Sequence, residues 1–445
     1  MKNFSKKIIV WFLQAEARAV IRRYKPKIIG VTGSVGKTTT KDLIYSVLSG
    51  NFSVRKNIKS FNSDIGMPLT ILDLPNAWLS PFAWLKNLLL GFWKVSIYYL
   101  LSITYPKYLV LELSADHPGD IKSPVSWLKP EIGVITGFGN EIPVHAEFFH
   151  NIESLIEEKG ELLKVLPENG VAILNIDDAR VWGMRGNTRA HIISYGFDQE
   201  AKIRGDGFHI SYNEEGLPKG IGFRIDYEGK SVPVRLSGVL GKGHAYAALA
   251  ATAVAVKLGM NLVAISQALS EHVFSPGRMR ILDGFREAII IDDTYNSSPA
   301  AVKIALESLH ELNLESRTPS SRKIAVLGDM LELGEHSGQE HKKVGTWVRG
   351  VADVLVCVGE CSKDIGENAI ADGFAKENVY FFADLPAEVS TKAGSFLKDF
   401  VQTGDIILLK ASQSIRLERA TEMLMANPSQ ASELLVRQEK EWKKR

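Results

Sequence analysis

The chain has 445 residues, too many for one ordinary core, so two or three separately packed domains are expected. Lys plus Arg number 53 against 51 for Asp plus Glu, a balance that gives no reason to propose nucleic acid as a partner. Hydrophobic residues make up 45%, as in ordinary globular proteins. Both cysteines, Cys357 and Cys361, lie in one apolar run and are interpreted as packing residues in a reducing compartment.

Residues 1–26 predict a basic amphipathic helix. The first 27 residues contain eight Lys or Arg and one Glu. The apolar stretch from Ile8 to Leu13 is too short for a secretory signal. A surface helix packed on the body of the protein is favoured over a helix lying on a membrane. One apolar face could be formed by Ile8, Ile9, Phe12, Val20 and Ile21.

The segment TGSVGKTTT, residues 32–40, follows a buried-strand pattern and precedes a helical pattern at 37–49. Glycines let the backbone fold tightly around an anion, and the start of a helix directs free N–H groups at it. Lys37 supplies a positive charge, and the Thr38 hydroxyl can reach Mg²⁺. The standard loop has glycine where this chain has Val31. The context still predicts a phosphate-binding loop formed by Gly33, Ser34, Val35, Gly36, Lys37, Thr38 and Thr39.

An apolar insertion occupies residues 77–106. The stretch from Pro81 to Pro106 could span a bilayer, but a single crossing would separate Lys37 from Glu112, which are expected at one site. The uncovered surface could face the membrane interface, a partner chain or the body of the protein. Internal packing or dimerisation is favoured over lipid. One helical stripe carries the smaller and more polar residues Asn87, Gly91, Lys94, Tyr98 and Ser102, leaving a wide aromatic-rich surface.

From Lys27 onward, short apolar runs alternate with helical patterns, which predicts an α/β protein with mostly parallel sheets. An antiparallel excursion is expected at 201–236. A domain boundary near residue 280 would separate a first domain, 27–280, from a second, 281–445, whose polar end from about 427 is expected to fray. Strands are expected at 28–32, 108–113, 131–136, 170–176, 288–292, 323–328, 354–359, 379–383 and 405–411.

Glu112 closes the apolar run YLVLEL, at the carboxyl edge of the predicted sheet where ligands bind in open α/β folds. A carboxylate that ends a buried run is costly unless it is paired. A bound metal ion would compensate the charge of this carboxylate.

The TGxxGKT form of the loop resembles that of the Mur ligases and their folate-ligating relatives. Further segments resemble the branch of that family that adds D-alanyl-D-alanine, and they occur in the family's order, so that the resemblance covers about residues 27–425. It implies a central phosphate-loop ATPase domain with a mostly parallel sheet, followed by a Rossmann-like C-terminal domain. The segments are FNSDIGMPLTIL (61–72), LELSADHPGDI (111–121), IDDTYNSSP (291–299), LGDMLELGEHS (327–337) and LLKASQSIRLE (408–418).

The resemblance implies a cytoplasmic ATP-dependent peptide ligase of peptidoglycan synthesis. Such an enzyme would join D-alanyl-D-alanine to a UDP-N-acetylmuramoyl tripeptide through an acyl phosphate. Thr38 and Glu112 would bind one Mg²⁺, and His145 would help to hold a second. Lys159 would carry a carbamate that faces the metal.

The same resemblance assigns residues of the second domain. Arg278 would reach the ATP phosphates, where an always-charged fork suits a transferring phosphate. Asp292 or Asp293, together with Asn296, would hold the ribose and base. Asn175 is a weaker candidate, because it also suits a plain turn. The face that receives the amino substrate would contain Asp329, Lys410, Ser412 and Ser414.

The chain also departs from the pattern. Only a short helix precedes the phosphate loop, where the branch has a domain that binds the UDP-sugar. The sugar nucleotide would therefore be bound differently or by another protein, or the acceptor would be another carboxylate. Ala248 stands where an asparagine commonly recognises adenine, and Ala411 and Gln413 replace a glycine and an arginine.

Three readings remain open. The favoured one is the D-alanyl-D-alanine ligase. A folylpolyglutamate-type or other muramoyl ligase is the second. The third is a nucleotide-binding scaffold that docks on a partner through residues 81–106, although it would not need all of the metal-facing groups. Residues 1–26 and 81–106 leave open a membrane or protein partner and a peripheral position at the inner membrane face.

Overall fold

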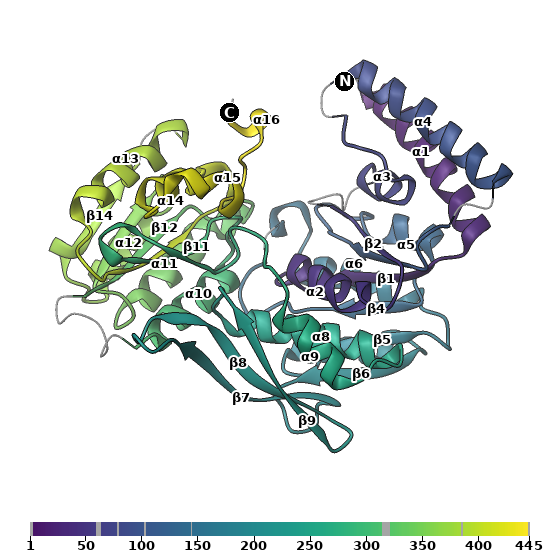
Figure 1. Cartoon of the computed structure of the whole chain (residues 1–445). Helices are drawn as coiled ribbons and strands as arrows, with labels where there is room; N and C mark the ends of the chain where they lie inside the picture. The colour runs from purple at the N-terminus through teal and green to yellow at the C-terminus, as the bar shows by residue number, and fades with distance from the viewer. Residues whose placement is uncertain are drawn as a thin grey trace.

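The computed structural model describes residues 3–58, 64–77, 80–101, 104–143, 145–313, 321–383 and 386–443. Residues 61–63 of the motif 61–72, Ser102 of the apolar insertion and Val144 lie outside these ranges. Two α/β bodies, each with its own sheet, form the molecule, and a pair of helices lies on the outside of the first body (Figure 1). The predicted α/β class with mostly parallel sheets is confirmed.

The first sheet has nine strands in the order β2-β3-β1-β4-β5-β6-β7-β8-β9. β1 lies between β3 and β4, runs parallel to both, and pairs Val31 with Glu112. The carboxyl ends of these strands therefore meet at one edge, which brings the loop after β1 next to Glu112. The parallel strands are β1 (Lys27–Thr32), β2 (Val54–Lys56), β3 (Tyr108–Glu112), β4 (Ile132–Ile135), β5 (Val171–Asn175) and β6 (His191–Gly196).

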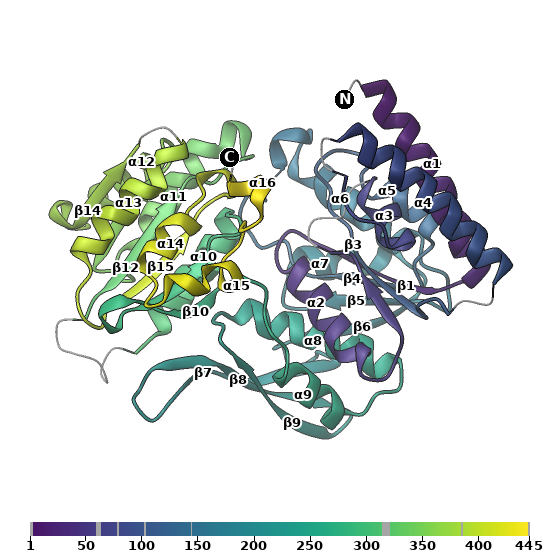
Figure 2. The ribbon, with the colours of Figure 1, turned by 45° about the horizontal axis from the view of Figure 1, so that its top comes forward.

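The predicted antiparallel excursion is also confirmed. β7 (Ile203–Tyr212) continues the sheet parallel to β6, and β8 (Pro218–Tyr227) and β9 (Lys230–Ser237) then pair antiparallel. This long ribbon lies at the far edge of the sheet from β2 (Figures 1 and 2).

Helices cover both faces of the first sheet, as expected for buried parallel strands. Successive side chains of β1 point to opposite faces, so Ile29 and Val31 join one core cluster and Ile28 the other. The first cluster is covered by α2 (Lys37–Ser49), α8 (Lys242–Lys257) and α9 (Leu262–Ser270). The second is covered by α3 (Gly66–Leu72), α5 (Lys122–Leu128), α6 (Ile152–Lys164) and α7 (Ala179–Gly183).

The second sheet has six strands in the order β10-β11-β15-β12-β13-β14, and all its neighbouring pairs except β10 with β11 are parallel. The strands are β10 (Arg280–Asp283), β11 (Ile289–Asp293), β12 (Lys323–Gly328), β13 (Val354–Val358), β14 (Val379–Phe382) and β15 (Ile406–Lys410). One face packs on α10 (Pro299–Glu311), α11 (Ser337–Val348) and α12 (Lys363–Ala371). The other packs on α13 (Pro386–Phe400), α14 (Glu418–Leu424) and α15 (Ala431–Leu434).

The end of the chain is ordered, so the expected fraying from residue 427 is wrong for the described part. Leu435 and Val436 are buried, and the Arg437 guanidinium donates a 2.9 Å hydrogen bond to the buried Glu418 carboxylate. A buried ion pair and two apolar anchors offset the polar composition that suggested disorder. The chain then ends in α16 (Lys440–Lys443).

α1 (Asn3–Tyr24) and α4 (Pro81–Leu100) lie side by side on the outside of the first body (Figures 1 and 2). α1 packs inward through Leu13, Ala17 and Val20. α4 begins where the Ser80 hydroxyl caps its first turn and Pro81 fixes the backbone. Its Trp84 is buried but much of its apolar surface is exposed, so the internal packing favoured for 81–106 is wrong for that surface. Within the described ranges, no helix is long and apolar enough to cross a membrane.

Candidate active site

The phosphate loop connects β1 to α2 at the carboxyl edge of the first sheet. Gly33 has a φ of 144° and Gly36 a φ of 83°, in regions that side chains disfavour. A Cβ on Gly33 would also lie 2.1 Å from the Thr136 hydroxyl oxygen. No side chain caps the start of α2, so its first N–H groups face the cavity as a site for an anion.

Glu112 lies beside this loop, only 4% exposed. Asn57 fixes its backbone with hydrogen bonds to both the N–H, at 2.9 Å, and the carbonyl, at 3.2 Å. One carboxylate oxygen accepts a 3.1 Å hydrogen bond from Thr38 Oγ1. The other lies 3.4 Å from Lys41 Nζ and has no hydrogen-bond partner. This buried carboxylate is thus held in place with one oxygen still able to accept a ligand.

Two lysines lie at the loop, Lys37 half-buried and Lys159 buried. Lys37 Nζ donates to the Ser34 carbonyl at 3.1 Å, and Lys159 Nζ, reaching in from α6, donates to the Gly33 carbonyl at 2.8 Å. Burial lowers the pKa of Lys37, and repulsion from Arg278 adds to this effect. Burial lowers the pKa of Lys159 well below the ordinary range, and repulsion from Lys37 adds to it. The lowered pKa shifts Lys159 toward the neutral amine, which is the nucleophilic form.

His145 connects the two bodies. It stands at φ 69° before the short helix Ala146–Phe148, and its backbone N–H donates to the Glu332 carbonyl at 3.1 Å. Its Nδ1 lies 2.9 Å from a Glu332 carboxylate oxygen, and its Nε2 lies 3.4 Å from one of Asp116. The bond with His145 lowers the pKa of Glu332. The imidazole thus stands between one acid from each body, at the rim of the cavity.

Arg278 extends over the loop from the other side. Its Nη2 donates to Thr38 Oγ1 at 3.3 Å, and its guanidinium carbon lies 3.9 Å from the centre of the Tyr295 ring. Stacking on an aromatic face holds a guanidinium in place without neutralising it. The charge is therefore aimed at the phosphate loop.

Asp292 and Asp293, the acidic pair that ends β11, accept hydrogen bonds from backbone N–H groups. Asp292 accepts from the Gly277 N–H at 3.0 Å, and burial raises its pKa to about 6. Asp293 accepts from the Met279 N–H at 3.2 Å and from Lys410 Nζ at 2.6 Å. Both acids thereby fix the segment that carries Arg278.

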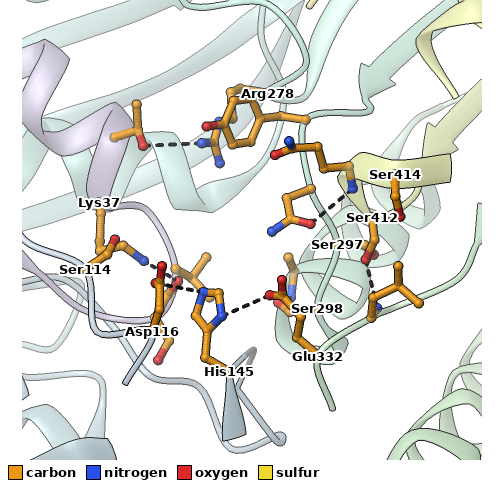
Figure 3. A pocket seen from close by; sticks show the side chains of 18 of the residues that line it. Lys37, Ser114, Asp116, His145, Arg278, Ser297, Ser298, Glu332, Ser412 and Ser414 are labelled. Atoms are coloured by element: carbon orange, nitrogen blue, oxygen red, sulfur yellow. Dashed lines mark hydrogen bonds and ion pairs between the residues drawn. The ribbon is translucent and has the colours of Figure 1, made fainter. Parts of the chain in front are cut away.

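A cavity of about 640 Å³ lies between the two bodies, with the loop on one wall and the second body on the other (Figure 3). Lys37, Ser114, Asp116 and His145 line it from the first body. From the second body come Asn296, Ser297, Ser298, Glu332, Ser412 and Ser414. The sequence-predicted residues Lys37, Thr38, Glu112, His145, Arg278, Asn296, Ser412 and Ser414 thus surround one space.

Several predicted site residues do not line this cavity, among them Gly33 and Thr39 of the loop itself. Lys159 lies behind the loop. Lys410 is 2% exposed, and its ammonium group is bound to Asp293 and the Asn296 carbonyl. Asp329 is 6% exposed and accepts from the Ser362 N–H at 2.8 Å. Asp293 fixes the backbone just after Arg278, at the Met279 N–H. These last three side chains support the walls of the cavity.

A second cavity, of about 320 Å³, shares Val35 and Gly36 with the first. Asn175, Tyr195 and Tyr246 line it, and the Tyr246 hydroxyl donates to Asp177 at 2.8 Å. Ala248 does not line it, because its side chain is buried in the hydrophobic core that α8 covers. The residue expected to weaken base recognition therefore lies away from both cavities.

Sequence reasoning missed several residues around the first cavity. Asp116 and Glu332 lie within the motif segments, but only their contacts with His145 single them out. Trp442 lines the cavity from the chain end, and its carbonyl accepts from Arg416 at 3.0 Å. Arg437 donates to the Thr294 carbonyl at 3.0 Å and to that of Tyr295. An isolated tryptophan and arginine in a charged tail gave no signal for these roles.

The oxygen atoms beside the loop fit a hard divalent cation such as Mg²⁺. Thr38 Oγ1 and Glu112 lie together, and the Glu112 oxygen that has no hydrogen-bond partner is buried. In the part of the chain that the structure describes, no three His, Cys, Asp or Glu side chains gather to hold a metal. Mg²⁺ commonly takes one or two carboxylates and completes its shell with phosphate and water, so this sparse set suits it.

A phosphate loop, oxygen atoms for Mg²⁺ and a stacked arginine converge on one cavity between two α/β bodies. This fold and site define a nucleotide-dependent enzyme that transfers a phosphoryl group. The family model of the Mur ligase middle domain matches residues 31–83 and 96–255, and that of the Mur ligase glutamate ligase domain matches residues 277–413. The chain therefore belongs to the Mur ligase family, which confirms the resemblance seen in its motifs.

Individual relatives agree. A UDP-N-acetylmuramoyl-tripeptide–D-alanyl-D-alanine ligase of Synechocystis is 32% identical over 418 residues, covering 92% of this chain and 77% of the relative. One of Bacillus subtilis is 27% identical, covering 94% and 79%. MurF from Acinetobacter baumannii has a TM-score of 0.74 at 25% identity, covering 94% and 80%. MurF from Thermotoga maritima, in complex with ADP, has a TM-score of 0.72 at 26% identity, covering 93% and 83%.

Proposed function

We propose that this chain is the ATP-dependent ligase that joins D-alanyl-D-alanine to a UDP-N-acetylmuramoyl tripeptide in peptidoglycan synthesis. The relatives from Synechocystis and Bacillus subtilis carry this activity in their names. The observation that carries the proposal is the convergence of Lys37, Thr38 with Glu112, and Arg278 on one cavity. Such a cleft suits activation of a carboxylate, because a carboxylate anion resists attack by an amine until it is phosphorylated.

The reaction would proceed in two steps. An oxygen of the tripeptide carboxylate attacks the γ-phosphorus of ATP, forming an acyl phosphate and releasing ADP. The amine of the dipeptide then attacks the acyl carbon through a tetrahedral intermediate, loses a proton, and expels phosphate with the former carboxylate oxygen. Lys37 and the N–H groups of Gly33 to Thr39 would hold the phosphates, and Arg278 would compensate the charge that develops on the γ-phosphoryl group.

The nucleotide would extend from the loop into the second cavity. Val35 and Gly36 line both cavities, so a ligand that fills the loop has a continuous path to Asn175 and Tyr246. The base would lie against the tyrosine ring, with the Asn175 amide available for hydrogen bonds. Asn296 would contact the ribose, positioned by Asp293 and Lys410.

Thr38 and Glu112 would hold one Mg²⁺, which supplies positive charge to the phosphate oxygens when bound. His145 would contribute to a second Mg²⁺ after giving up its contacts with Asp116 and Glu332. Both acids are also oxygen donors for such an ion.

Lys159 would carry a carbamate. A neutral buried amine attacks the carbon of CO₂, the nitrogen loses a proton, and the product is an anion that can face Mg²⁺. Labelling with ¹³C-bicarbonate tests this, because a carbamate ¹³C resonance is expected in the wild-type chain and not in a Lys159→Met variant. A spectrum without that resonance in the wild type would remove the carbamate.

The amino substrate would bind on the second body, next to Ser412 and Ser414. Asp329 and Lys410 would support this surface from the side that faces away from the substrate. The Asp329 carbonyl accepts from the Ser412 N–H at 2.9 Å, which fixes the loop that presents these hydroxyls. We further propose a cytoplasmic enzyme with a first domain at 27–280 and a second at 281–445. Residues 1–26 and 81–106 would attach it to a membrane surface or to a protein partner.

The test is ADP release from ATP and Mg²⁺ with UDP-N-acetylmuramoyl tripeptide and D-alanyl-D-alanine. Turnover is expected only when both substrates are present, and it should be lost in Arg278→Met but kept in the matched surface variant Arg349→Met. Turnover with a folate and glutamate alone would replace the proposal by a folylpolyglutamate-type ligase. Turnover with another amino acid would indicate another muramoyl ligase. An absence of turnover with every pair would favour the nucleotide-binding scaffold.

A further inference from the structure

α4 packs with its polar side inward. Asn87 is 3% exposed and donates to the Pro75 carbonyl at 2.7 Å. Lys94 Nζ donates to the Asp73 carbonyl at 2.7 Å and to that of Leu72 at 3.2 Å. Gly91 lies so close to Glu16 of α1 that an added Cβ would meet its carboxylate at 2.1 Å. In a surface helix the polar side normally faces water. In α4 the polar side instead anchors the helix to the first body.

The opposite side of α4 is apolar and uncovered. Phe82, Leu85, Leu89, Phe92 and Trp93 are exposed by 85%, 57%, 64%, 68% and 62%, and they are called the apolar face here. Their spacing of three or four residues places them on one side of the helix. On the neighbouring α1, Trp11 is 65% exposed. A continuous apolar stripe of this size marks a contact with something outside the chain.

The charge around the apolar face is mostly positive, although an exposed acid, Asp73, lies 3.9 Å from Lys94 Nζ. Residues 74–107 contain three lysines and no Asp or Glu, and residues 1–27 contain eight basic residues and one acid, Glu16. Arg18, Arg22 and Arg23 of α1 are exposed. Glu16 is half-buried under α4, and burial raises its pKa to about 7. Burial thus reduces the negative charge that this acid contributes at neutral pH.

The apolar face and its basic surroundings together decide whether a second copy of the chain or an anionic bilayer covers the face. A second copy of the chain, packed face to face, would bring two basic α1 helices together without acids to pair them. An anionic bilayer offers hydrocarbon for the phenylalanine, leucine and tryptophan side chains and phosphate for the arginines. The match to the family's middle domain is interrupted between residues 83 and 96, within α4, so all of the apolar face except Phe82 lies outside the part that the family model describes.

We propose that α1 and α4 form a lipid-docking element, with the apolar face of α4 lying in the interface of an anionic bilayer and the basic side chains of α1 contacting its headgroups. The helices lie along the surface and do not cross it. Both are anchored to the first body, so docking would hold the reaction cleft close to the membrane. This inference does not depend on the proposed ligase reaction.

Flotation of the full chain with phosphatidylglycerol vesicles, with phosphatidylcholine vesicles as the neutral comparison, tests the inference. Binding is expected to phosphatidylglycerol, to weaken at high salt, and to be weaker with phosphatidylcholine. The double variant Phe92→Asp/Trp93→Asp is expected to lose about tenfold or more in partitioning, because it places charge in the interface. The matched control is Val263→Asp/Val273→Asp, which changes two exposed valines on and after α9 and should bind like wild type.

Two further measurements keep the result interpretable. ADP release with water-soluble substrates should be unchanged in the Phe92→Asp/Trp93→Asp variant, which separates lost docking from misfolding. In the wild type, brominated phosphatidylglycerol should quench tryptophan fluorescence, and Trp93→Phe should reduce the quenching while binding is retained. A wild-type chain that ignores both kinds of vesicle would overturn the proposal. So would a dimer in analytical ultracentrifugation that the double variant dissociates, since a second copy would then occupy the face.

Discussion

The phosphate-loop edge of the first sheet and the outer side of α4 belong to the same body, and each reverses the usual placement of side chains. At the loop, Lys159 and Glu112 are ionisable groups withdrawn from water, and Lys37 is partly buried beside them. On α4, Phe92 and Trp93 are apolar groups left in it. Either arrangement costs free energy in the isolated chain.

The two reversals differ in how the rest of the chain supports them. Around the loop other elements fix several of the functional groups, such as Asn57 for the Glu112 backbone and Tyr295 for Arg278. The apolar face of α4 is held in position through the opposite side of the helix, where Asn87 and Lys94 are hydrogen-bonded to the first body. The loop is therefore organised to bind small charged ligands. The outer side of α4 is organised to contact a larger apolar surface, which would cover its exposed side chains. The predictions below test this contrast in order of expected effect.

Lys37→Met should give the largest change. It removes the one ammonium group aimed at the phosphates, and loss of such a group lowers kcat by about 10²–10³-fold. Thermal unfolding should show no loss of stability, since burial makes the charged lysine costly in the absence of nucleotide. Steady-state ADP release measures the first effect and calorimetry the second. Lys363→Met, an exposed change on α12, should leave both unaltered, and a fully active Lys37→Met variant would contradict the assignment of the loop.

Lys159 should make stability depend on pH. Because its pKa is lowered on folding, the folded chain binds fewer protons than the unfolded chain between that lowered value and the ordinary lysine value of 10.5. Stability should therefore rise with pH through this window, and below it the cost of burying the ammonium form is present in full. Lys159→Met should reduce the rise, as followed by urea unfolding at pH 7 and pH 10 in bicarbonate-free buffer. An unchanged slope would show that the folded lysine titrates normally.

Arg437→Met should weaken the wall of the cavity that holds Tyr295. The change leaves the Thr294 and Tyr295 carbonyls without their donor, at a cost of about 1–3 kcal/mol to the free energy of unfolding. Arg278 stacks on Tyr295, so KM for ATP should rise as well. Urea unfolding and initial-rate kinetics measure the two effects, with Lys398→Met on α13 as the control. A variant with normal stability and normal KM would show that the chain end does not support the site.

Phe92→Asp/Trp93→Asp should change the free energy of unfolding least, by about 0.5 kcal/mol or less in lipid-free buffer. These side chains are mostly exposed, so the folded chain loses little packing when they are replaced. Asn87→Leu is the contrasting change on the buried side, where the Pro75 carbonyl would lose its donor and stability should fall. Equal losses for the two variants in urea unfolding would mean that the apolar face is packed in solution.

Much of the loop could be predicted from the sequence because its chemistry is local. The glycines, Lys37 and Thr38 are consecutive, and the end of an apolar strand places Glu112 at the same edge. Asp329 and Lys410 could not be placed in this way. Each follows or ends a strand, but whether its carboxylate or ammonium group faces the cavity depends on Ser362 and Asp293, which are distant in sequence.

The orientation of α4 could not be predicted for a similar reason. Periodicity separates its two sides correctly, and hydrophobicity then argues that the aromatic side is buried. The structure reverses that choice, because Asn87 and Lys94 find unpaired carbonyls at Pro75 and Asp73. The chain end was also misjudged, since one buried pair between Arg437 and Glu418 outweighs its polar composition.

Transfer of labelled oxygen tests the central claim most directly. The tripeptide acceptor is prepared with ¹⁸O in its reacting carboxylate and incubated with the chain, ATP, Mg²⁺ and D-alanyl-D-alanine. Attack by the carboxylate on the γ-phosphorus predicts one ¹⁸O atom in each inorganic phosphate released, in equal amount to the new peptide. Peptide formed without ¹⁸O in phosphate, or with ¹⁸O in AMP, would contradict phosphorylation of the acceptor in this cleft.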